Sequence, residues 1–113
     1  MFEPFDEEVI SRELAGLPAR DAAKLTALMI HYQTCGTGNP APVQIDDYGD
    51  GILRLRHIKP AYQGRMLFFC VDQSSSKARL IILAIYKKEG DAVPARVLRT
   101  ARTRRQDWQA KQK

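Results

Sequence analysis

Cysteine and long apolar runs are scarce in this chain of 113 residues. Cys35 and Cys70 stand far apart and match no metal-ligand spacing, so we expect reduced thiols and neither a disulfide scaffold nor a zinc module. No apolar stretch is long enough to span a bilayer, which excludes a membrane helix. The N-terminus, MFEPFDEEVI, is acidic where a secretory signal would be basic, and this favours the cytoplasm. The length predicts a single domain over residues 1–113.

The signature motifs of several enzyme classes are missing as well. There is no glycine-rich phosphate loop and no GxSxG nucleophile elbow. Acidic residues gather in the first predicted helix and at Asp46, Asp47 and Asp50, without the spacing of a metal site. We therefore expect no metal and no cofactor, and the pattern disfavours a metal-dependent nuclease.

Acidic residues are also scarce in the second half of the chain. Residues 1–50 carry three Lys or Arg against nine Asp or Glu, a net charge of −6. Residues 51–113 carry 15 against four, a net charge of +11. This segregation predicts that the second half faces a polyanion, most simply nucleic acid, and the alternative is a solvated basic helix at the C-terminus.

Hydrophobic periodicity predicts an α+β fold. Apolar stripes with a period of 3.6 indicate helices over Phe5–Gly16, capped by Asp6, and over Pro18–Gln33. Gly36–Val43 is expected to be a loop, after which the period changes to 2. Strands are then predicted near residues 53–57, 64–72 and 80–88, with residues 73–77 as a hairpin loop and a last helix from Pro94 to Ala110.

These elements predict a small antiparallel sheet of three to four strands, the fourth being a short edge strand at Met1–Pro4. The sheet is expected to pack against the two N-terminal helices, with the C-terminal helix beside them. Leu80–Ile85 is uniformly aliphatic, which predicts a strand buried on both faces.

Basic side chains are predicted to converge at one edge of that sheet. The end of one antiparallel strand lies near the start of the next, which brings Lys87 and Lys88 beside Arg65. The same rule brings Arg56, His57 and Lys59 to this edge, with Tyr86 among them. Like charges held this closely repel one another unless an anion offsets them. The sequence therefore predicts an anion-binding rim.

Each of these residues also has an ordinary structural explanation. Arg54 can be simply solvated, and paired lysines at a strand end often protect an edge from aggregation. His57 alternates with core leucines and can be a packed histidine. Tyr86 follows the apolar run and can belong to the core or serve as a stacking platform. It is the convergence of these residues that favours a function.

Four ordered motifs resemble the HigB-like branch of the RelE/ParE toxin superfamily, and together they cover nearly the whole chain. They are DGILRLR, GRMLFF, LIILAIYKK and a Pro-led helix carrying ARTRRQDW. The matching residues are Gly51, Leu55, Arg56, Arg65, Phe68, Phe69, Lys87, Lys88, Pro94, Ala101, Arg102, Arg104 and Trp108. The chain departs from the pattern at Leu83 and Ile85, where the family often has His and Phe, and at Gly64, where an aromatic commonly precedes the Arg.

The resemblance implies a RelE-like fold and the toxin of a type II toxin–antitoxin system. Such a toxin is a ribosome-dependent mRNA endonuclease that a cognate antitoxin, expected to be a helix-turn-helix protein, holds inactive. The implied partners are this antitoxin, the ribosome and mRNA, and operator DNA through the antitoxin complex, with no membrane. The basic rim fits metal-independent cleavage, in which the RNA's own 2′-hydroxyl attacks the adjacent phosphate and the enzyme stabilises the developing charge.

Within that resemblance we assign roles to the basic residues. Arg65 and Arg56 are expected to hold the scissile phosphate through their planar guanidinium groups. Lys88 or Lys87 is the first candidate for proton transfer or charge stabilisation, and His57 and Lys59 come next. The residues expected to bind RNA are Arg54, Lys59, Tyr86, Arg102 and Arg105.

Two other functions stay open at this point. A ParE-type toxin poisons DNA gyrase by protein contact and would need no catalytic cluster, so alanine at Arg65 and Lys88 would leave it toxic. A basic module that binds RNA or DNA without any activity is the third reading.

Overall fold

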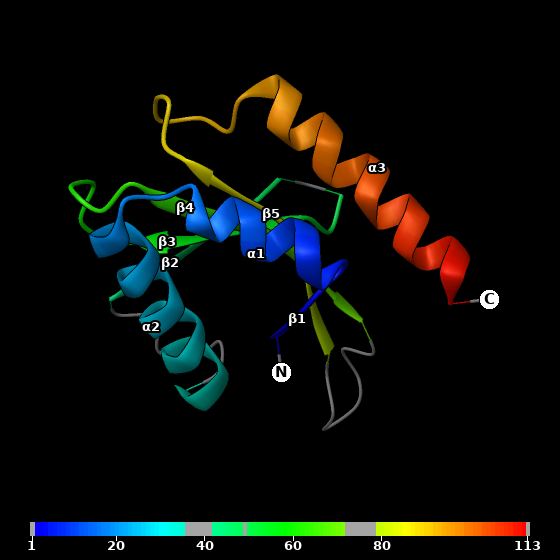
Figure 1. The fold of residues 1–113 in the computed structure, drawn as a ribbon, viewed down its shortest axis with the longest axis horizontal. Helices are drawn as coiled ribbons and strands as arrows, with labels where there is room; N and C mark the ends of the chain where they lie inside the picture. Colours follow the sequence, from blue (N-terminus) through cyan, green and yellow to red (C-terminus); the bar gives the residue numbers. More distant parts are fainter. Residues whose placement is uncertain (1, 36–41, 49, 72–78, 113) are drawn as a thin grey trace.

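The computed structural model describes residues 2–35, 42–48, 50–71 and 79–112. In this part of the chain the order of elements is β1 (Phe2–Pro4), α1 (Glu7–Ala15), α2 (Ala19–Cys35), β2 (Val43–Asp47), β3 (Leu53–His57), β4 (Gly64–Val71), β5 (Arg79–Lys87) and α3 (Ala95–Lys111). The strands form one five-stranded sheet in the order β1-β5-β4-β3-β2 (Figure 1). The α+β class is therefore confirmed.

The sheet has more strands than the three to four predicted, and the prediction that all of them are antiparallel was only partly right. β1 runs parallel to β5, while the other neighbouring strands are antiparallel, so the sheet is mixed. The short edge strand expected at the N-terminus is present as β1. β2 was missed because the glycine- and proline-rich stretch before it was extended as a loop through Val43, which is the first residue of β2. The expected loop residues 36–41 and hairpin residues 73–77 lie outside the described part.

Local capping explains where the first helix begins. The side chain of Asp6 accepts a hydrogen bond from the backbone N–H of Val9 at 3.1 Å, as an N-cap residue does. The helix starts at Glu7 and not at Phe5, because the N–H of Phe5 still bonds to the carbonyl of Ile82 in the neighbouring strand, at 2.9 Å. Asp6 was therefore the correct cap.

The sheet has a separate apolar cluster on each face. Met66, Phe68 and Leu55 pack with residues of α1 and α2 on one face. Leu67 and Phe69 pack with Ala101 and Trp108 of α3 on the other face (Figure 1). Alternate residues of a strand point to opposite faces, so helices and strands together bury both sides. This arrangement confirms that β5 is buried on both faces, as its aliphatic run predicted.

Gly64 marks a close approach between α2 and the start of β4. A side chain at this position would meet Leu17 Cδ1 at 3.2 Å and the backbone oxygen of Asp21 at 3.4 Å. A side chain before Arg65 would therefore crowd Leu17 and the backbone of Asp21, which gives a packing reason for one departure from the family pattern. Among the described residues, no helix is both long and apolar enough to cross a membrane.

Candidate functional site

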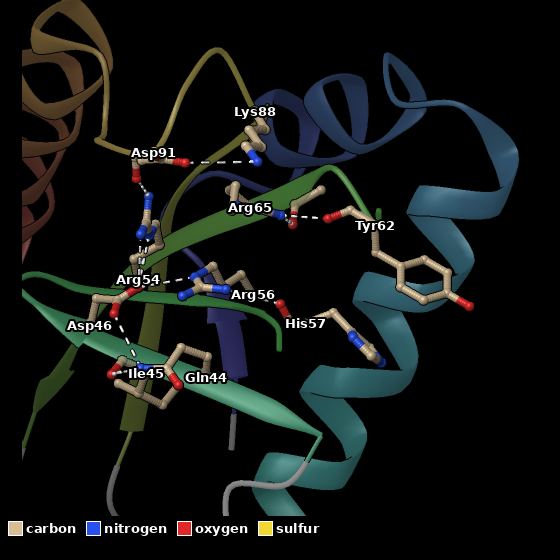
Figure 2. A network of polar contacts seen from close by, with 11 residues as sticks. Gln44, Ile45, Asp46, Arg54, Arg56, His57, Tyr62, Arg65, Lys88 and Asp91 are labelled. Carbon is tan, nitrogen blue, oxygen red and sulfur yellow. Dashed lines mark hydrogen bonds and ion pairs between the residues drawn. The ribbon is translucent and has the colours of Figure 1, made fainter. Parts of the chain in front are cut away.

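A cavity of about 190 Å³ opens at the edge where β3, β4 and β5 come together. Its lining consists mostly of basic side chains, together with the β3–β4 loop and the loop that leads into α3: Arg54, Arg56, Pro60, Arg65, Lys88, Gly90 and Asp91. We call this cavity the basic pocket. Figure 2 shows its cationic side chains, which come from three different strands or strand ends. The structure therefore brings part of the predicted basic rim together, as a pocket on the face that α3 partly covers.

Arg54 is the most securely held residue of the basic pocket. Only 6% of it is exposed, so the expectation that it is a solvated surface residue was wrong. Its Nε and Nη2 donate to Asp46 Oδ2 at 3.0 and 2.8 Å, and its Nη1 donates to the carbonyl of Asp91 at 3.1 Å (Figure 2). These contacts fix the guanidinium at the floor of the pocket.

Asp46 holds two arginines through a single oxygen. The Oδ2 atom that binds Arg54 also accepts from Arg56 Nε at 3.3 Å, while Oδ1 accepts from Gln44 at 3.3 Å. Burial raises the pKa of this carboxyl. Hydrogen bonds from Arg54 and Gln44 and the charges of both arginines together lower it by more, so the pKa of Asp46 is below its usual range. Asp46 is therefore an anionic anchor for the pocket.

Arg65 lies deeper than a rim residue would, with 3% of its surface exposed. Its Nη1 donates to the carbonyls of Tyr62 at 2.6 Å and Gly64 at 3.1 Å, and no carboxylate in the described part of the chain pairs with it. Burial lowers the pKa of Arg65, and the charges of Arg54 and Arg56 lower it further. Arg65 is thus a buried cation whose environment opposes its charge, which is the condition that an incoming anion relieves.

The paired lysines at the end of β5 point to different faces. Lys88 lines the pocket, with 25% of its side chain exposed and Nζ 4.0 Å from Asp91 Oδ1. Lys87 pairs with Gly64, whereas Tyr86 pairs with Arg65, so Lys87 and Arg65 point to opposite faces. Lys87 is exposed on the face of α1 and α2. The structure brings Lys88, but not Lys87, to the basic pocket.

His57 and Lys59 also lie away from the pocket. The buried His57 shares its face with Leu55, and its Nδ1 accepts from the N–H of Lys59 at 2.9 Å. Its ring lies 4.6 Å from that of Tyr62, between the strand and α2 (Figure 2). Burial lowers the pKa of His57, and the charges of Lys24 and Lys59 lower it further. His57 is the packed histidine that the alternative reading described.

Tyr86 sits beneath Arg54 and is half-buried. Burial raises the pKa of its hydroxyl, and the positive charge of the neighbouring Arg54 acts in the opposite direction. Within the described residues, the buried hydroxyl oxygen has no hydrogen-bond partner. Its ring packs against the α3-side cluster, so it supports Arg54 and is not presented as a free stacking surface.

Arg102 and Arg105 bind the turn between β2 and β3. Arg102 Nε donates to Asp50 Oδ2 at 2.9 Å, and Arg105 Nη1 donates to the carbonyl of Asp50 at 2.6 Å. These two arginines fasten α3 to the sheet, and the structure does not bring them to the basic pocket.

The sequence reasoning missed Asp46 and Asp91 as parts of the site. Asp46 faces Arg54 directly in the β2–β3 register. A hairpin centred on the Asp-Gly turn would have shown this pairing, had β2 been recognised. Gly90, with φ of 141°, forms the turn that brings the carbonyl of Asp91 over Arg54, and a left-handed φ of this kind favours glycine.

Four cations around a small cavity can hold one tetrahedral oxyanion and stabilise added negative charge on it. Within the described residues, no group of three or more His, Cys, Asp or Glu side chains is arranged to hold a metal ion. The fold and the pocket define a small α+β protein with a cavity lined mainly by cations.

Comparison with protein families places the chain more closely. Residues 12–106 match the family described as phage derived protein Gp49-like (DUF891). The chain therefore belongs to this family, a RelE/ParE-like toxin family of toxin–antitoxin systems. A toxin of such a system has a cognate antitoxin as its partner. Comparison with curated proteins gives no match.

Proposed function

We propose that this chain is a HigB-like toxin that cleaves mRNA on the ribosome and thereby arrests translation and growth. One observation carries the proposal: Arg65 is buried without a carboxylate partner among the described residues, in a pocket that it shares with Arg54, Arg56 and Lys88. Among the residues that the structure describes, only Asp46 and the exposed Asp91 offset these charges. A phosphodiester is the biological anion that best fits such a site.

In this mechanism the pocket holds the scissile phosphate. Arg56 and Arg65 contact its non-bridging oxygens, and Arg54, fixed by Asp46, supplies a positive floor. The ribose 2′-oxygen attacks phosphorus, the bond to the 5′-oxygen breaks, and the products are a 2′,3′-cyclic phosphate and a 5′-hydroxyl. The arginines stabilise the extra negative charge of the phosphorane-like transition state.

Lys88 is the pocket residue placed to move a proton. Its ammonium reaches the pocket from the partly exposed side, where it donates a proton to the departing 5′-oxygen. The 2′-hydroxyl loses its proton to water on the open side of the pocket. Lys87, His57 and Lys59 take no part in this scheme because they lie on the other side of the sheet or loop.

Ribosome dependence is supported by what the pocket does not offer to a nucleotide. The cavity has room for a phosphate group, and its described lining contains no aromatic ring on which a base could stack. Such a site holds charge but orients a flexible RNA poorly. The ribosome would supply the alignment that in-line attack requires.

The test is to induce the chain in a bacterium and to map mRNA ends by primer extension in translating extracts. We expect growth arrest that a neighbour-encoded antitoxin relieves, together with cleavage that is unchanged when the toxin has been treated with EDTA beforehand and that stops when translation initiation is blocked. Efficient cutting of naked RNA would contradict ribosome dependence. Toxicity that persists in both Arg65→Ala and Lys88→Ala, with no cleavage, would favour a gyrase poison instead.

A further inference from the structure

A second group of cations lies across the β3–β4 loop from the basic pocket. Arg20 and Lys24 of α2 approach the ring of Tyr62, with Arg20 Cζ 4.7 Å and Lys24 Nζ 4.8 Å from its centroid. Lys59, on the same loop, is exposed and close enough to lower the pKa of His57. We call Arg20, Lys24 and Lys59 the loop cluster.

The charges of the loop cluster are held in place without being neutralised. Among the described residues, no ion pair involves any of the three, and Arg20 donates only to the carbonyl of Ala61, at 3.1 Å. The nearest carboxylate in sequence, that of Asp21, is buried and accepts instead from the N–H of Gln63 at 3.0 Å. An aromatic ring attracts cations through its quadrupole and leaves their full charge available to an anion.

Tyr62 connects the loop cluster to the basic pocket. Its ring contacts two of the cations. Its backbone carbonyl accepts the 2.6 Å hydrogen bond from Arg65, which Figure 2 shows. Pro60 of the same loop lines the pocket. The β3–β4 loop thus separates two groups of positive charge, and an RNA strand bound in the pocket can continue across the loop.

We propose that the loop cluster is a second anion site, which binds backbone phosphates of the RNA strand next to the one held in the basic pocket. This inference rests on the proposed function. Tyr62 already contacts His57 and the two cations, so it organises charge and does not stack a base. Recognition by the loop cluster is therefore independent of sequence and falls steeply with salt.

The experiment measures binding of an uncleavable 2′-O-methyl RNA strand of about 12 nucleotides, a typical size for a single-strand site, at several salt concentrations. The Arg20→Gln/Lys24→Gln variant is compared with Arg99→Gln/Lys111→Gln, which removes two exposed charges from α3, at the far side of the molecule from α2 (Figure 1). For the loop-cluster variant we expect the slope of log K against log salt to flatten by about 1.4, or about 0.7 per lost phosphate contact. Between 50 and 200 mM salt, this amounts to roughly sevenfold less loss of affinity than in the wild type.

A second variant tests the role of the ring. Tyr62→Leu keeps an apolar contact for His57 but removes the quadrupole, and we expect part of the same flattening while the Arg65 contact to the backbone carbonyl remains. Equal effects in the loop-cluster and α3 variants would overturn the proposal, since the loss would then be one of general charge. The proposal would also be overturned if the Arg20→Gln/Lys24→Gln variant bound RNA as the wild type does but bound empty ribosomes or the antitoxin more weakly. Because the RNA probe cannot be cut, this result does not depend on whether the wild type cleaves mRNA.

Discussion

Asp46 and Arg54 face each other across the β2–β3 pair, with Oδ2 of the carboxylate 2.8 Å from Nη2 of the guanidinium. The same oxygen binds Arg56, so one carboxylate positions two of the four cations of the basic pocket. Among the described residues, Arg65 donates to backbone carbonyls and Lys88 has only the exposed Asp91 as an ion-pair partner, at 4.0 Å. The pocket is therefore rigid on one side and electrostatically unsatisfied on the other, which suits a site that must hold an anion in a fixed orientation.

Asp46→Asn should cost stability as well as activity. Arg54 would remain buried without its counter-charge, and removing one partner of a buried pair costs about 3–5 kcal/mol. Asp46 is partly exposed, so we expect a loss of about 2–4 kcal/mol in the free energy of unfolding, measured by urea denaturation. Asp107→Asn, at an exposed position of α3, is the control and should change this value by less than about 0.5 kcal/mol.

The same substitution should flatten the acid limb of the stability curve. The pKa of Asp46 is lowered in the folded protein, so its contribution is present above the unfolded value of about 3.9 and is lost as the pH falls through the lower folded pKa. Asp50 and Glu3 also have lowered pKa values, so the wild type should lose stability over the same range. The difference between wild type and Asp46→Asn should shrink below pH 4, and a constant difference would contradict this.

Arg65→Ala should separate activity from stability. The substitution leaves two carbonyls without a donor, at a cost of about 1 kcal/mol each, but it also removes a buried charge that Arg54 and Arg56 repel. We expect the free energy of unfolding to stay within about 1 kcal/mol of wild type. Cleavage in translating extracts should fall about 100-fold or more. Arg65→Lys keeps the charge without the planar fork, so its cleavage rate should lie between those of the wild type and Arg65→Ala. If Arg65→Ala is both inactive and unfolded, the loss of activity cannot be assigned to the pocket, and the prediction fails.

The sequence pattern located the strands that carry the site but could not fix which side chains share a face. Alternation alone would put Lys87 with Ile81 and Leu83. The β4–β5 pairing shifts by one residue between Leu67 and Phe68, so Leu83 and Ala84 both join the α3-side cluster. This bulge brings Lys88 to the pocket in place of Lys87, and a bulge is decided by packing and not by hydrophobic pattern.

The environments of Arg54 and His57 could not be predicted from the sequence either. The sequence left both with two possible environments. Arg54 became a pocket residue because β2 brings Asp46 against it, and His57 became a packed residue because it shares the face of Leu55 beneath α2. Each outcome depends on a partner that is remote along the chain or lies in an unrecognised element.

Lys88→Ala and Lys87→Ala form a matched pair of adjacent residues. Lys88 lines the basic pocket, and Lys87 is exposed on the opposite face. We expect Lys88→Ala to lower the cleavage rate about 100-fold, as loss of a positioned charge-stabilising donor does, and Lys87→Ala to leave it within about twofold. Primer extension in the same translating extract measures both. Equal losses would show that the pair acts through general charge and not through the pocket.

Leu83→Asp should abolish folding. Leu83 is fully buried in the α3-side cluster, where a carboxylate would lose its hydration, and the neighbouring guanidinium of Arg104 is already paired with Glu13 and with the Leu83 carbonyl. We expect no cooperative thermal transition in circular dichroism, whereas Ile30→Asp, at a position that is 58% exposed, should melt cooperatively. A cooperatively melting Leu83→Asp protein would mean that β5 is not the buried strand described above.

The Glu13–Arg104 pair should stabilise the sheet by completing the open edge of β5. β1 ends opposite Ile82, and beyond it Arg104 Nη1 donates to the carbonyl of Leu83 while Glu13 Oε1 accepts from the N–H of Ile85, each at 2.9 Å. The two side chains are themselves joined, with Nη2 and Oε2 2.8 Å apart, so together they replace a missing strand and bind α1 to α3.

Double-mutant cycles would measure this coupling. For Glu13→Ala and Arg104→Ala we expect a coupling energy of about 1–3 kcal/mol, because the pair is only 19–26% exposed and each partner also satisfies a strand atom. The exposed pair of Glu8 and Arg12 on α1 is the control and should give about 0.5 kcal/mol or less. Hydrogen exchange adds a local readout, since Glu13→Ala should lower the protection of the Ile85 amide, whereas Glu8→Ala should not. Equal coupling in the two cycles would show that Glu13 and Arg104 form an ordinary surface pair.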